Sequence, residues 1–328
     1  MKIIDNDLVN SFPLVGVITI NYNHSELTVD CINSILLSEY PSFFLMVVDN
    51  GSSSDDFQKL RTSFENEKIY FTRIEKNTGY VGGVNHGLME SSKLNPDYYL
   101  IMNNDTILDK RAIKSLVITA QKYQDNAIVS GKVYNMDEPN TLQYIGQKCL
   151  SLNKFDFPAY IPEMKEEDTG QYDKEIEMGM LDDIFWLLPD KIYESIGLYS
   201  TDYFLYGEQN DYALRVVKKG FRLIYTPEAK IWHFLHMTTS NGALMSRKVL
   251  YWQSYATMVL AVSHLPLYYF LRLYLKSNAR LLLDYLKSAL ITRNKIERGY
   301  NAARLTGVFY FSLWLFDRKP NKGYNPYD

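Results

Sequence analysis

Apolar runs alternate with helical patterns along the first part of the chain. Four runs, over residues 14–20, 43–48, 69–74 and 98–103, have the length and apolar content of buried strands. Each is followed by a segment whose apolar residues recur at helical spacing, and Pro41 ends the first of these segments. Strands that alternate with helices in this way predict an α/β fold with a mostly parallel, doubly wound sheet flanked by helices.

The pattern continues less regularly after the fourth strand. Residues 127–134, 181–188 and 221–225 predict further strands, and residues 190–196 and 208–219 predict helices. Residues 135–174 are rich in charge and proline, so we expect long loops with a hairpin there. From about residue 246 the pattern becomes helical and aromatic. We therefore predict two parts, an α/β domain over residues 1–240 and a basic, aromatic helical region over residues 241–328.

Composition indicates a globular protein in a reducing compartment. A content of 46% hydrophobic and 22% charged residues fits a packed core and argues against disorder. The two cysteines, Cys31 and Cys149, cannot form a disulfide framework, which favours the cytoplasm. The amino terminus has acids early and lacks a long apolar core, so we expect no signal peptide. No run reaches the roughly 18 apolar residues of a membrane span.

Charge is distributed unevenly between the two parts. Residues 246–328 contain 13 Lys and Arg against 4 Asp and Glu, whereas residues 1–245 contain 22 against 34. Arg272, Lys276, Arg280 and Lys287 fall on one side of a predicted helix. A basic stripe beside a wide apolar face favours peripheral attachment to an anionic membrane surface, although the same face could simply pack on the α/β domain. The aromatic residues follow helix faces and do not form stacking platforms, which argues against nucleic acid binding.

Polar residues follow the fourth predicted strand directly. Its carboxyl end delivers Asn103, Asn104 and Asp105, at the edge where open α/β sheets bind ligands. A carboxylate there can hold a hard cation such as Mg²⁺ or Mn²⁺, which in turn binds a diphosphate. The competing interpretation is that Asn104, Asp105 and Thr106 only turn the chain and cap the helix whose apolar side begins near Ile113.

Similar polar segments follow the other strands. They are Ile20-Asn21-Tyr22-Asn23, Val47-Val48-Asp49-Asn50-Gly51-Ser52, Asn77-Thr78-Gly79-Tyr80-Val81-Gly82-Gly83-Val84-Asn85-His86-Gly87 and Asn103-Asn104-Asp105-Thr106, with weaker continuations over residues 203–211 and 227–233. In this order they resemble the family 2 inverting glycosyltransferases with the GT-A fold, especially a bacterial rhamnosyltransferase-like branch that builds surface polysaccharides. The resemblance covers about residues 14–240, and it implies a Rossmann-like sheet with a C-terminal helical extension.

The resemblance implies a donor pocket at the first two loops. Asn21, Asn23 and Asp49 would hold the nucleoside, with Asp49 accepting the imide N–H of uracil or thymine. A base without that N–H would leave a buried acceptor unpaired. Taken alone, Asp49 could equally cap a turn.

The glycine-rich segment is implied to complete this pocket. Gly82 and Gly83 would let the backbone approach the nucleotide sugar, and Asn77 and Asn85 would supply polar contacts. Tight packing of a helix is the competing explanation for the glycines.

A divalent metal site is implied at the fourth strand. The Asn-Asn-Asp variant of the family motif makes Asp105 the main ligand of Mg²⁺ or Mn²⁺, with Asn103 or Asn104 contacting sugar or phosphate. One carboxylate binds such a cation weakly, so the donor diphosphate would complete the shell. His233 is implied as a further ligand, with His236 as the alternative. A single histidine beside an apolar segment is more often structural.

Inverting transfer needs a base that deprotonates the acceptor hydroxyl. Glu208 opens the predicted helix and is the first candidate, with Asp211 one turn further. The family usually has an acidic pair here, whereas this chain has Gln209 at the second position. If that position normally supplies the base, the role falls to Glu208, Asp211 or another acid such as Asp182 or Asp183. A helix amino terminus also favours acids for structural reasons.

These features predict a metal-dependent inverting glycosyltransferase. It would move a sugar, with rhamnose preferred, from a dTDP or UDP donor to a hydroxyl of a lipid-linked glycan at the inner face of the plasma membrane. The expected partners are the nucleoside-diphosphate sugar, that lipid-linked acceptor and an anionic membrane surface, and a homo-oligomer is compatible with the sequence. The alternative is a catalytically impaired, nucleotide-binding scaffold protein that retains the pocket but lacks the base at Gln209.

Overall fold

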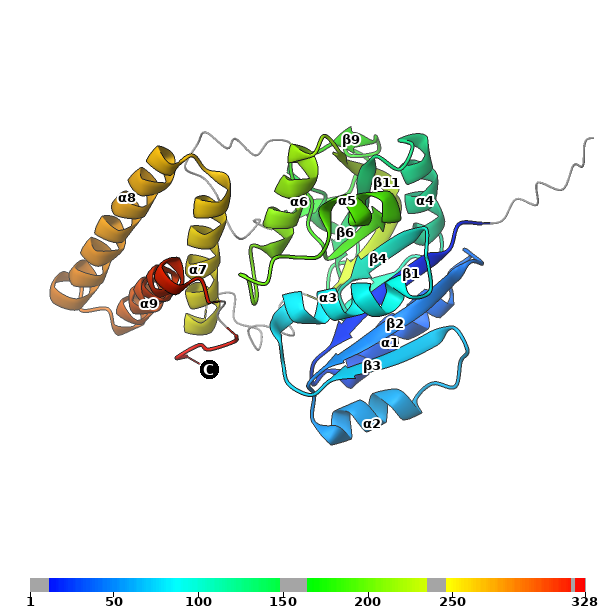
Figure 1. The fold of residues 1–328 in the computed structure, drawn as a ribbon, viewed down its shortest axis with the longest axis horizontal. Coiled ribbons are helices and arrows are strands. Elements are labelled where there is room, and N and C mark those ends of the chain that lie inside the picture. The colour runs from blue at the N-terminus through cyan, green and yellow to red at the C-terminus, as the bar shows by residue number, and fades with distance from the viewer. Residues whose placement is uncertain (1–11, 148–163, 235–245, 320–321, 328) are drawn as a thin grey trace, which may run out of the picture.

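The computed structural model describes residues 12–147, 164–234, 246–319 and 322–327. A single large sheet forms the centre of the α/β part, and three long helices lie beside it (Figure 1). The strand order is β3-β2-β1-β4-β10-β6-β11-β5, with short strands added at the side. The α/β fold class and the C-terminal helices are therefore confirmed.

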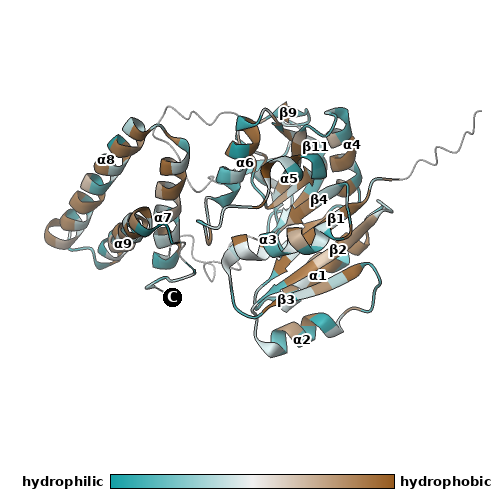
Figure 2. Cartoon of the chain, in the orientation of Figure 1, coloured by the Kyte–Doolittle hydropathy of each residue, from teal (hydrophilic) through white to brown (hydrophobic). Residues whose placement is uncertain are grey.

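The first half of the sheet is parallel. It contains β1 (Val15–Asn21), β2 (Phe43–Asn50), β3 (Ile69–Ile74) and β4 (Tyr98–Met102), in which β1 lies between β2 and β4. The helices between these strands are α1 (Ser25–Leu36), α2 (Ser54–Thr62) and α3 (Gly79–Ser92). Every residue of β1, β2 and β4 is buried, which explains their continuous apolar runs, coloured brown in Figure 2.

The second half is mixed in direction. Strand β10 (Phe185–Pro189) runs antiparallel to β4 and β6 (Ala127–Asn135), while β11 (Arg222–His233) is parallel to β6. The remaining elements are β5 (Thr106–Leu108), α4 (Ala112–Lys122), β7 (Thr141–Tyr144), β8 (Glu166–Glu167), β9 (Ile176–Glu177), α5 (Asp190–Ile196) and α6 (Glu208–Lys218). Strands β6, β7 and β8 pair antiparallel, so the expected hairpin after residue 135 is present.

One local prediction was wrong, and one competing interpretation is excluded. The last strand does not end at Tyr225 but continues to His233, because a register shift between Tyr225 and Lys230 accommodates Pro227 and pairing with β6 resumes at Lys230. Asp105 and Thr106 do not cap a helix, because β5 follows at once and α4 begins only at Ala112. As a result, His233 of β11 and Thr106 of β5 lie opposite each other at the edge of the sheet. A loop after Tyr225, or a helix directly after Asp105, would not have paired them.

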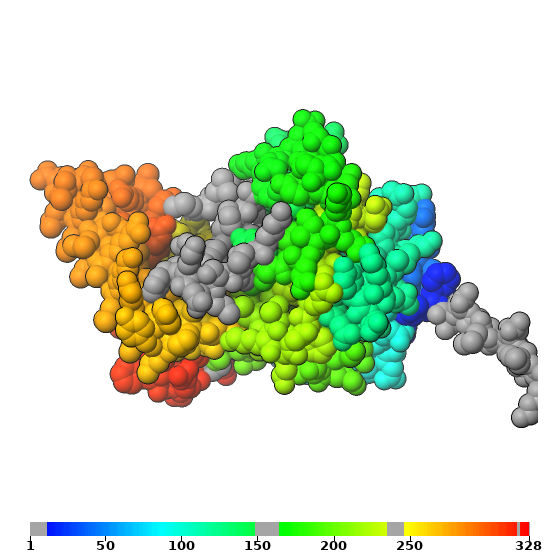
Figure 3. All heavy atoms as spheres, turned by 90° about the horizontal axis from the view of Figure 1, so that it is seen from above, coloured from blue at the N-terminus to red at the C-terminus, as the bar shows by residue number. Residues whose placement is uncertain are grey.

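The C-terminal region is helical. It contains α7 (Arg247–His264), α8 (Leu267–Leu286), η1 (Lys287–Ile291) and α9 (Lys295–Asp317). Helix α7 lies next to α6, and α8 extends away from the α/β part, at the far end of the molecule in the view of Figure 3. None of the helices that the structure describes is both long and apolar enough to cross a bilayer. The boundary at residue 240 stays a prediction, since residues 235–245 lie outside the described part.

Candidate functional site

A buried asparagine links the first loops of the sheet. The side-chain nitrogen of Asn21 donates to Asp49 Oδ1 at 3.1 Å, to Ser52 Oγ at 3.1 Å and to Asp56 Oδ2 at 2.8 Å. Its side-chain oxygen accepts from the hydroxyl of Thr28 at 2.8 Å. Because the Asn21 amide is fully engaged inside the protein, it positions Asp49 instead of reaching outward itself.

Asp49 is the charged group of this network. Its side chain is buried, and Arg73 Nε lies 3.4 Å from Asp49 Oδ2. That oxygen has no hydrogen bond within the described residues. The Arg73 guanidinium also donates to the backbone oxygen of Ser52 at 2.8 Å, so it holds the β2–α2 loop as well. A buried carboxylate oxygen without a donor is costly, and it is suited to receive one from a ligand.

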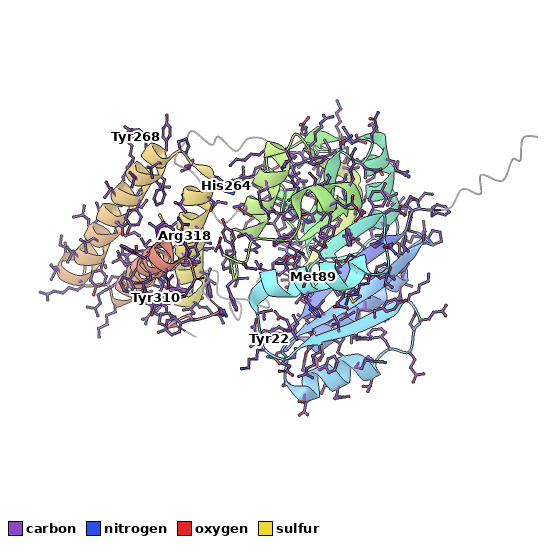
Figure 4. The ribbon with its side chains drawn as sticks, viewed as in Figure 1. Tyr22, Met89, His264, Tyr268, Tyr310 and Arg318 are labelled. Carbon is purple, nitrogen blue, oxygen red and sulfur yellow. The ribbon has the colours of Figure 1, made fainter. Side chains whose placement is uncertain are left out.

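Asn23 joins the two loops across their tips. Its backbone N–H donates to Ser52 Oγ at 2.9 Å, and its side-chain oxygen accepts from the backbone N–H of Ser53 at 2.8 Å. Asn23 has φ of 56°, in the left-handed region that asparagine tolerates. The neighbouring Tyr22 is exposed on the same loop, as its label in Figure 4 shows.

The glycine-rich segment packs against the sheet. A Cβ on Gly83 would lie 2.9 Å from Ile20, and one on Gly82 would collide with the Thr78 side chain. Close approach of α3 to β1 therefore accounts for Gly83, whereas Gly82 makes room for the side chain of Thr78 at the start of the same helix. Asn77 closes the turn before the helix, because its side-chain oxygen accepts from Gly79 N at 2.8 Å.

Asn85 connects α3 to the segment before α6. Its side-chain nitrogen donates to Tyr199 O at 3.0 Å, and its oxygen accepts from Tyr199 N at 2.9 Å. This paired contact fixes a loop 114 residues away along the chain. Asn85 thus fixes the backbone of Tyr199 in the segment before α6.

Asp105 and His233 meet at the ends of neighbouring strands. His233 Nε2 lies 3.2 Å from Asp105 Oδ1, and His233 Nδ1 lies 3.0 Å from Gln143 Oε1. Both side chains are largely buried. Strand β11 brings His233 opposite Thr106 of β5, which is why the longer strand matters for the site. His236 lies outside the described residues.

The two asparagines of the same motif differ. Asn104 is buried and donates to Thr28 Oγ1 at 2.8 Å, which connects it through Thr28 to Asn21. Asn103 is half-buried, and its backbone N–H and C=O bond to Ile184 and Thr106. The hydrogen-bond chain therefore runs without interruption from the β4 end to the β2 end of the sheet.

A cluster of acids lies where α6 begins. Burial, and then the nearby Asp183, raise the pKa of Glu208 well above its usual range. Burial, and then Asp182, raise the pKa of Asp183 to about 8, and the Tyr199 hydroxyl donates to this carboxyl at 3.0 Å. Glu208 Oε2 is buried and has no hydrogen-bond partner in the described part of the chain. These acids therefore bind protons more tightly than ordinary carboxyl groups do.

Asp182 connects the acid cluster to the His233 end. Burial raises its pKa, and both the charge of His233 and a hydrogen bond from the Gln209 side chain act in the opposite direction. The same Asp182 raises the pKa of Glu208. The Asp105–His233 pair and Glu208 therefore belong to one electrostatically connected site.

Asp211, one turn further along α6, has a different setting. Its carboxylate contacts Arg215 Nε at 2.8 Å and His264 Nε2 at 2.7 Å. Burial alone would raise the pKa of Asp211, but the hydrogen bond from His264 and the charge of Arg215 overcome this, so the pKa is lowered. His264 is labelled at the end of α7 in Figure 4, and Asp211 therefore anchors the C-terminal helices to α6.

Comparison with known proteins identifies this arrangement. The family model described as "Glycosyl transferase family 2" matches residues 16–197, more than half of the chain. The chain belongs to this family. The matched segment includes Asn21, Asp49, Asp105 and the Asp182–Asp183 pair, while Glu208 and His233 lie beyond it. The predicted enzyme class, a glycosyltransferase, is thereby confirmed.

Individual relatives of this glycosyltransferase are distant. A poly-beta-1,6-N-acetyl-D-glucosamine synthase of Staphylococcus aureus is 21% identical over 228 residues, which are 70% of this chain and 51% of that protein. The chain thus spans about half the length of the curated relatives that it matches. GalNAc-T7, solved with UDP, GalNAc and Mn²⁺, superposes with a TM-score of 0.56 at 11% identity, covering 94% of this chain and 57% of that one.

A second solved structure matches this chain over most of the length of both proteins. The mannosyltransferase PcManGT from Pyrobaculum calidifontis, in complex with GDP-Man and Mn²⁺, has a TM-score of 0.53 at 13% identity, with 94% and 89% of the two chains covered. At these identities the likeness establishes the GT-A-like fold of the glycosyltransferase and no more. The predicted GT-A architecture is confirmed.

Several contacts of the glycosyltransferase site were not foreseen. Ser52, Thr28 and Arg73 hold the Asp49 region, and Gln143 holds His233. Thr28 lies within α1, and Gln143 lies in the stretch that was expected to be irregular. No local pattern marks these residues, because each acts through partners distant in sequence.

Proposed function

We propose that this protein is a metal-dependent, inverting glycosyltransferase that uses a nucleoside-diphosphate sugar. The observation that carries the proposal is the single connected edge formed by Asp49, by the Asp105–His233 pair and by the buried acids beside Glu208. Asp49, Asp105 and His233 lie at the carboxyl ends of β2, β4 and β11. Asp182 and Asp183 precede the antiparallel strand β10, and Glu208 opens α6. The carboxyl ends of the parallel strands are where α/β sheets bind their ligands.

The nucleoside would lie over the β1 and β2 loops. Asp49 Oδ2 is buried without a hydrogen bond, so an imide N–H of uracil or thymine would satisfy it. Arg73, whose side chain is 32% exposed, would have to shift as the base enters. Cytosine has no such N–H and would leave Asp49 unpaired, which favours UDP or dTDP donors over CDP donors.

A divalent cation fits the Asp105–His233 pair. A carboxylate oxygen and an imidazole nitrogen, 3.2 Å apart and both largely buried, offer two ligands suited to Mn²⁺ or Mg²⁺. No group of three or more His, Cys, Asp and Glu side chains suited to a metal occurs within residues 12–147, 164–234, 246–319 and 322–327. The donor diphosphate would therefore supply further ligands, and a bound cation would stabilise negative charge on that diphosphate.

Glu208 is the proposed catalytic base. It would take the proton of the acceptor hydroxyl as that oxygen attacks the anomeric carbon, on the face opposite the departing diphosphate. Its raised pKa makes it a stronger proton acceptor when it is ionised. Asp211 is already held by Arg215 and His264, so we assign it to positioning α6.

Gln209 does not by itself imply a loss of activity. Its side chain hydrogen-bonds Asp182. Burying Glu208 Oε2 without a hydrogen bond costs folding free energy, and such a cost is typical of functional sites. We therefore favour the enzyme over the nucleotide-binding scaffold. If the wild type turns over no donor, the scaffold interpretation replaces it. If turnover is measurable and neither Glu208→Gln nor Asp183→Asn alters it, the assignment of these acids to catalysis fails.

Our proposals for the acceptor and the donor sugar rest on similarity to other proteins. The relative named as a poly-beta-1,6-N-acetyl-D-glucosamine synthase suggests a polysaccharide product, and we propose a lipid-linked glycan as acceptor. Rhamnose from a dTDP donor stays our preferred sugar on branch resemblance alone.

Helix α8 supports attachment to the inner face of the membrane. Phe270 and Leu273 of α8 are buried, whereas the next face of the helix leaves large apolar side chains exposed. The exposed residues are Leu267, Tyr268, Leu271, Leu275, Leu282 and Leu286. Exposed basic residues, Lys276 and Lys287 among them, follow on the adjoining face, and Figure 4 shows Tyr268 at the outer end of the helix. An apolar face bordered by cations suits an anionic headgroup region.

A thermal-shift screen tests the proposed donor. UDP, dTDP, GDP and CDP sugars are compared with and without Mn²⁺. We expect UDP or dTDP sugars to raise the melting temperature selectively and only with Mn²⁺. Equal stabilisation by all four, or none by any, contradicts the donor assignment. Sedimentation with phosphatidylglycerol vesicles, compared with phosphatidylcholine vesicles, tests the membrane surface separately.

A further inference from the structure

A pocket of about 360 Å³ lies among the three C-terminal helices. In Figure 1, α7 and α8 diverge from their connecting turn, and α9 lies across them. Gly307 allows α9 to approach α7 closely, since a Cβ there would collide with the backbone oxygen of Tyr251. Helix α8 is held farther away, and the space between the three helices is the pocket. Its volume falls within the range of small-molecule sites.

The lining of the pocket is mostly apolar. Met258 from α7, Leu281 from α8 and Val308 from α9 line it, and its polar lining comes from Gln253 and Ser277 among others. Such a surface favours a hydrocarbon group of a few carbons or a flat apolar ring. It does not by itself say which ligand enters.

Two arginines determine the charge of the pocket. Arg280 from α8 and Arg304 from α9 both line it, and no Asp or Glu is among the described residues that form the lining. Arg280 Nε is 3.8 Å from Asp284 Oδ2 with its side chain 81% exposed, so this pair is weak. Arg304 Nη1 donates to the neutral Asn301 side chain at 3.1 Å. Two guanidinium groups that face one space repel each other, and an anion between them removes this repulsion.

We propose that this pocket binds a phosphate-headed amphiphile. Arg280 and Arg304 hold the phosphate with charge-assisted hydrogen bonds, for which the planar guanidinium is suited. The first carbons of the chain lie over Met258, Leu281 and Val308. The pocket adjoins α8, whose exposed apolar and basic faces would lie in the headgroup region, so such a ligand can enter from the membrane.

Two sources share this chemistry, a membrane phospholipid and a prenyl phosphate that carries a glycan. The binding site is independent of sugar transfer, so its test does not depend on the activity proposed above. Calorimetric titration of the full chain compares geranyl phosphate and dihexanoyl phosphatidic acid, both below their micellar concentration, with geraniol and inorganic phosphate. We expect both amphiphiles to bind at least about tenfold more tightly than either control, since head and tail each contribute. Tighter binding of geranyl phosphate would identify a prenyl phosphate as the ligand, and tighter binding of dihexanoyl phosphatidic acid would identify a membrane phospholipid.

Matched variants locate the binding. Arg280→Gln combined with Arg304→Gln should weaken binding of geranyl phosphate at least about tenfold, whereas Arg298→Gln, on an exposed part of α9, should leave it unchanged. Met258→Trp fills the pocket and should also abolish binding, with circular dichroism confirming that the helices persist. Amphiphile binding that equals the wild type in both the double variant and Met258→Trp overturns the proposal. So does binding of geraniol as tight as that of geranyl phosphate.

Discussion

The two ends of the site are built on opposite principles. At the β1–β2 end, the side-chain polar groups of Asn21 all have partners, and Asn23 and Ser52 hold the loops in place. At the α6 end, Glu208 Oε2 and Gln209 Oε1 are buried without hydrogen bonds in the part of the chain that the structure describes. The first end is a hydrogen-bonded frame that stabilises the fold, and within it Asp49 Oδ2 has no hydrogen bond from the described residues. The second keeps acids in an unfavourable state, as expected of groups whose partner is the substrate.

The largest expected effect falls between these two ends, at Asp105. Replacing Asp105 with Asn should lower kcat/KM for the donor by about a thousandfold or more, because a bound cation is worth several kcal/mol of charge stabilisation. Steady-state release of the nucleoside diphosphate measures this. Asp55→Asn, an exposed acid in α2, is the control and should retain full activity. Wild-type activity in Asp105→Asn would show that a cation held by Asp105 does not contribute to catalysis.

Glu208→Gln should affect activity and stability in opposite directions. We expect kcat to fall about a hundredfold, at the low end for a catalytic base, because Asp183 lies nearby and can take part of the role. The melting temperature should stay the same or rise, since a buried carboxyl is replaced by a neutral amide. Glu194→Gln on α5 is exposed and should change neither quantity. A clear loss of stability with unchanged kcat would identify Glu208 as part of the frame.

Replacing Asn21, at the β1–β2 end, should lower stability more than catalysis. Asn21→Ala leaves Asp49 and Asp56 without their shared donor, so the free energy of unfolding should fall by about 2 kcal/mol. Urea denaturation measures this, and the KM for the donor should rise while kcat changes little. Asn66→Ala, in an exposed turn, serves as the control. An unchanged midpoint in Asn21→Ala would mean that the network is not a stabilising frame.

Per pH unit, the smallest effect is a dependence of stability on pH that comes from the acid cluster. The pKa of Asp183 is about 8 in the folded chain and about 4 in an unfolded one. Its contribution to stability is therefore fully present below pH about 4 and is lost as the pH rises to about 8, at about 1 kcal/mol per pH unit. Asp183→Asn should flatten this slope in urea denaturation from pH 5 to 8. An identical slope in the two proteins would contradict the raised pKa.

The contrast between the two ends also explains what the sequence could predict. Strands β1, β2 and β4 are buried along their whole length, so their apolar runs were sufficient to predict them. Asp49 and Asp105 come at or just after the ends of such runs, and Glu208 opens a helical pattern, so all three could be selected as candidates. The continuation of β11 through Pro227 could not, since a bulge compensates for the proline only in the context of the paired strand.

Roles within the site were harder to predict than positions. Asn77, Gly82, Gly83 and Asn85 belong to the predicted segment, yet their contacts in the structure close a turn, pack a helix and hold the Tyr199 loop. Which surface an amide faces depends on partners tens of residues away, and no local pattern encodes them. The contact of Asp211 with His264 is of the same kind, because it joins two regions that the sequence suggested only as separate parts.

The most direct test of the central claim is the coupling between Mn²⁺ and a nucleoside diphosphate. Calorimetric titration with UDP and with dTDP, in the presence and absence of Mn²⁺, measures it in the wild type and in Asp105→Asn. We predict that Mn²⁺ tightens binding of one of these nucleotides about tenfold or more in the wild type, and that the gain disappears in the variant. The same affinity with and without Mn²⁺ in the wild type, for both nucleotides, would contradict a site built around Asp105 and His233.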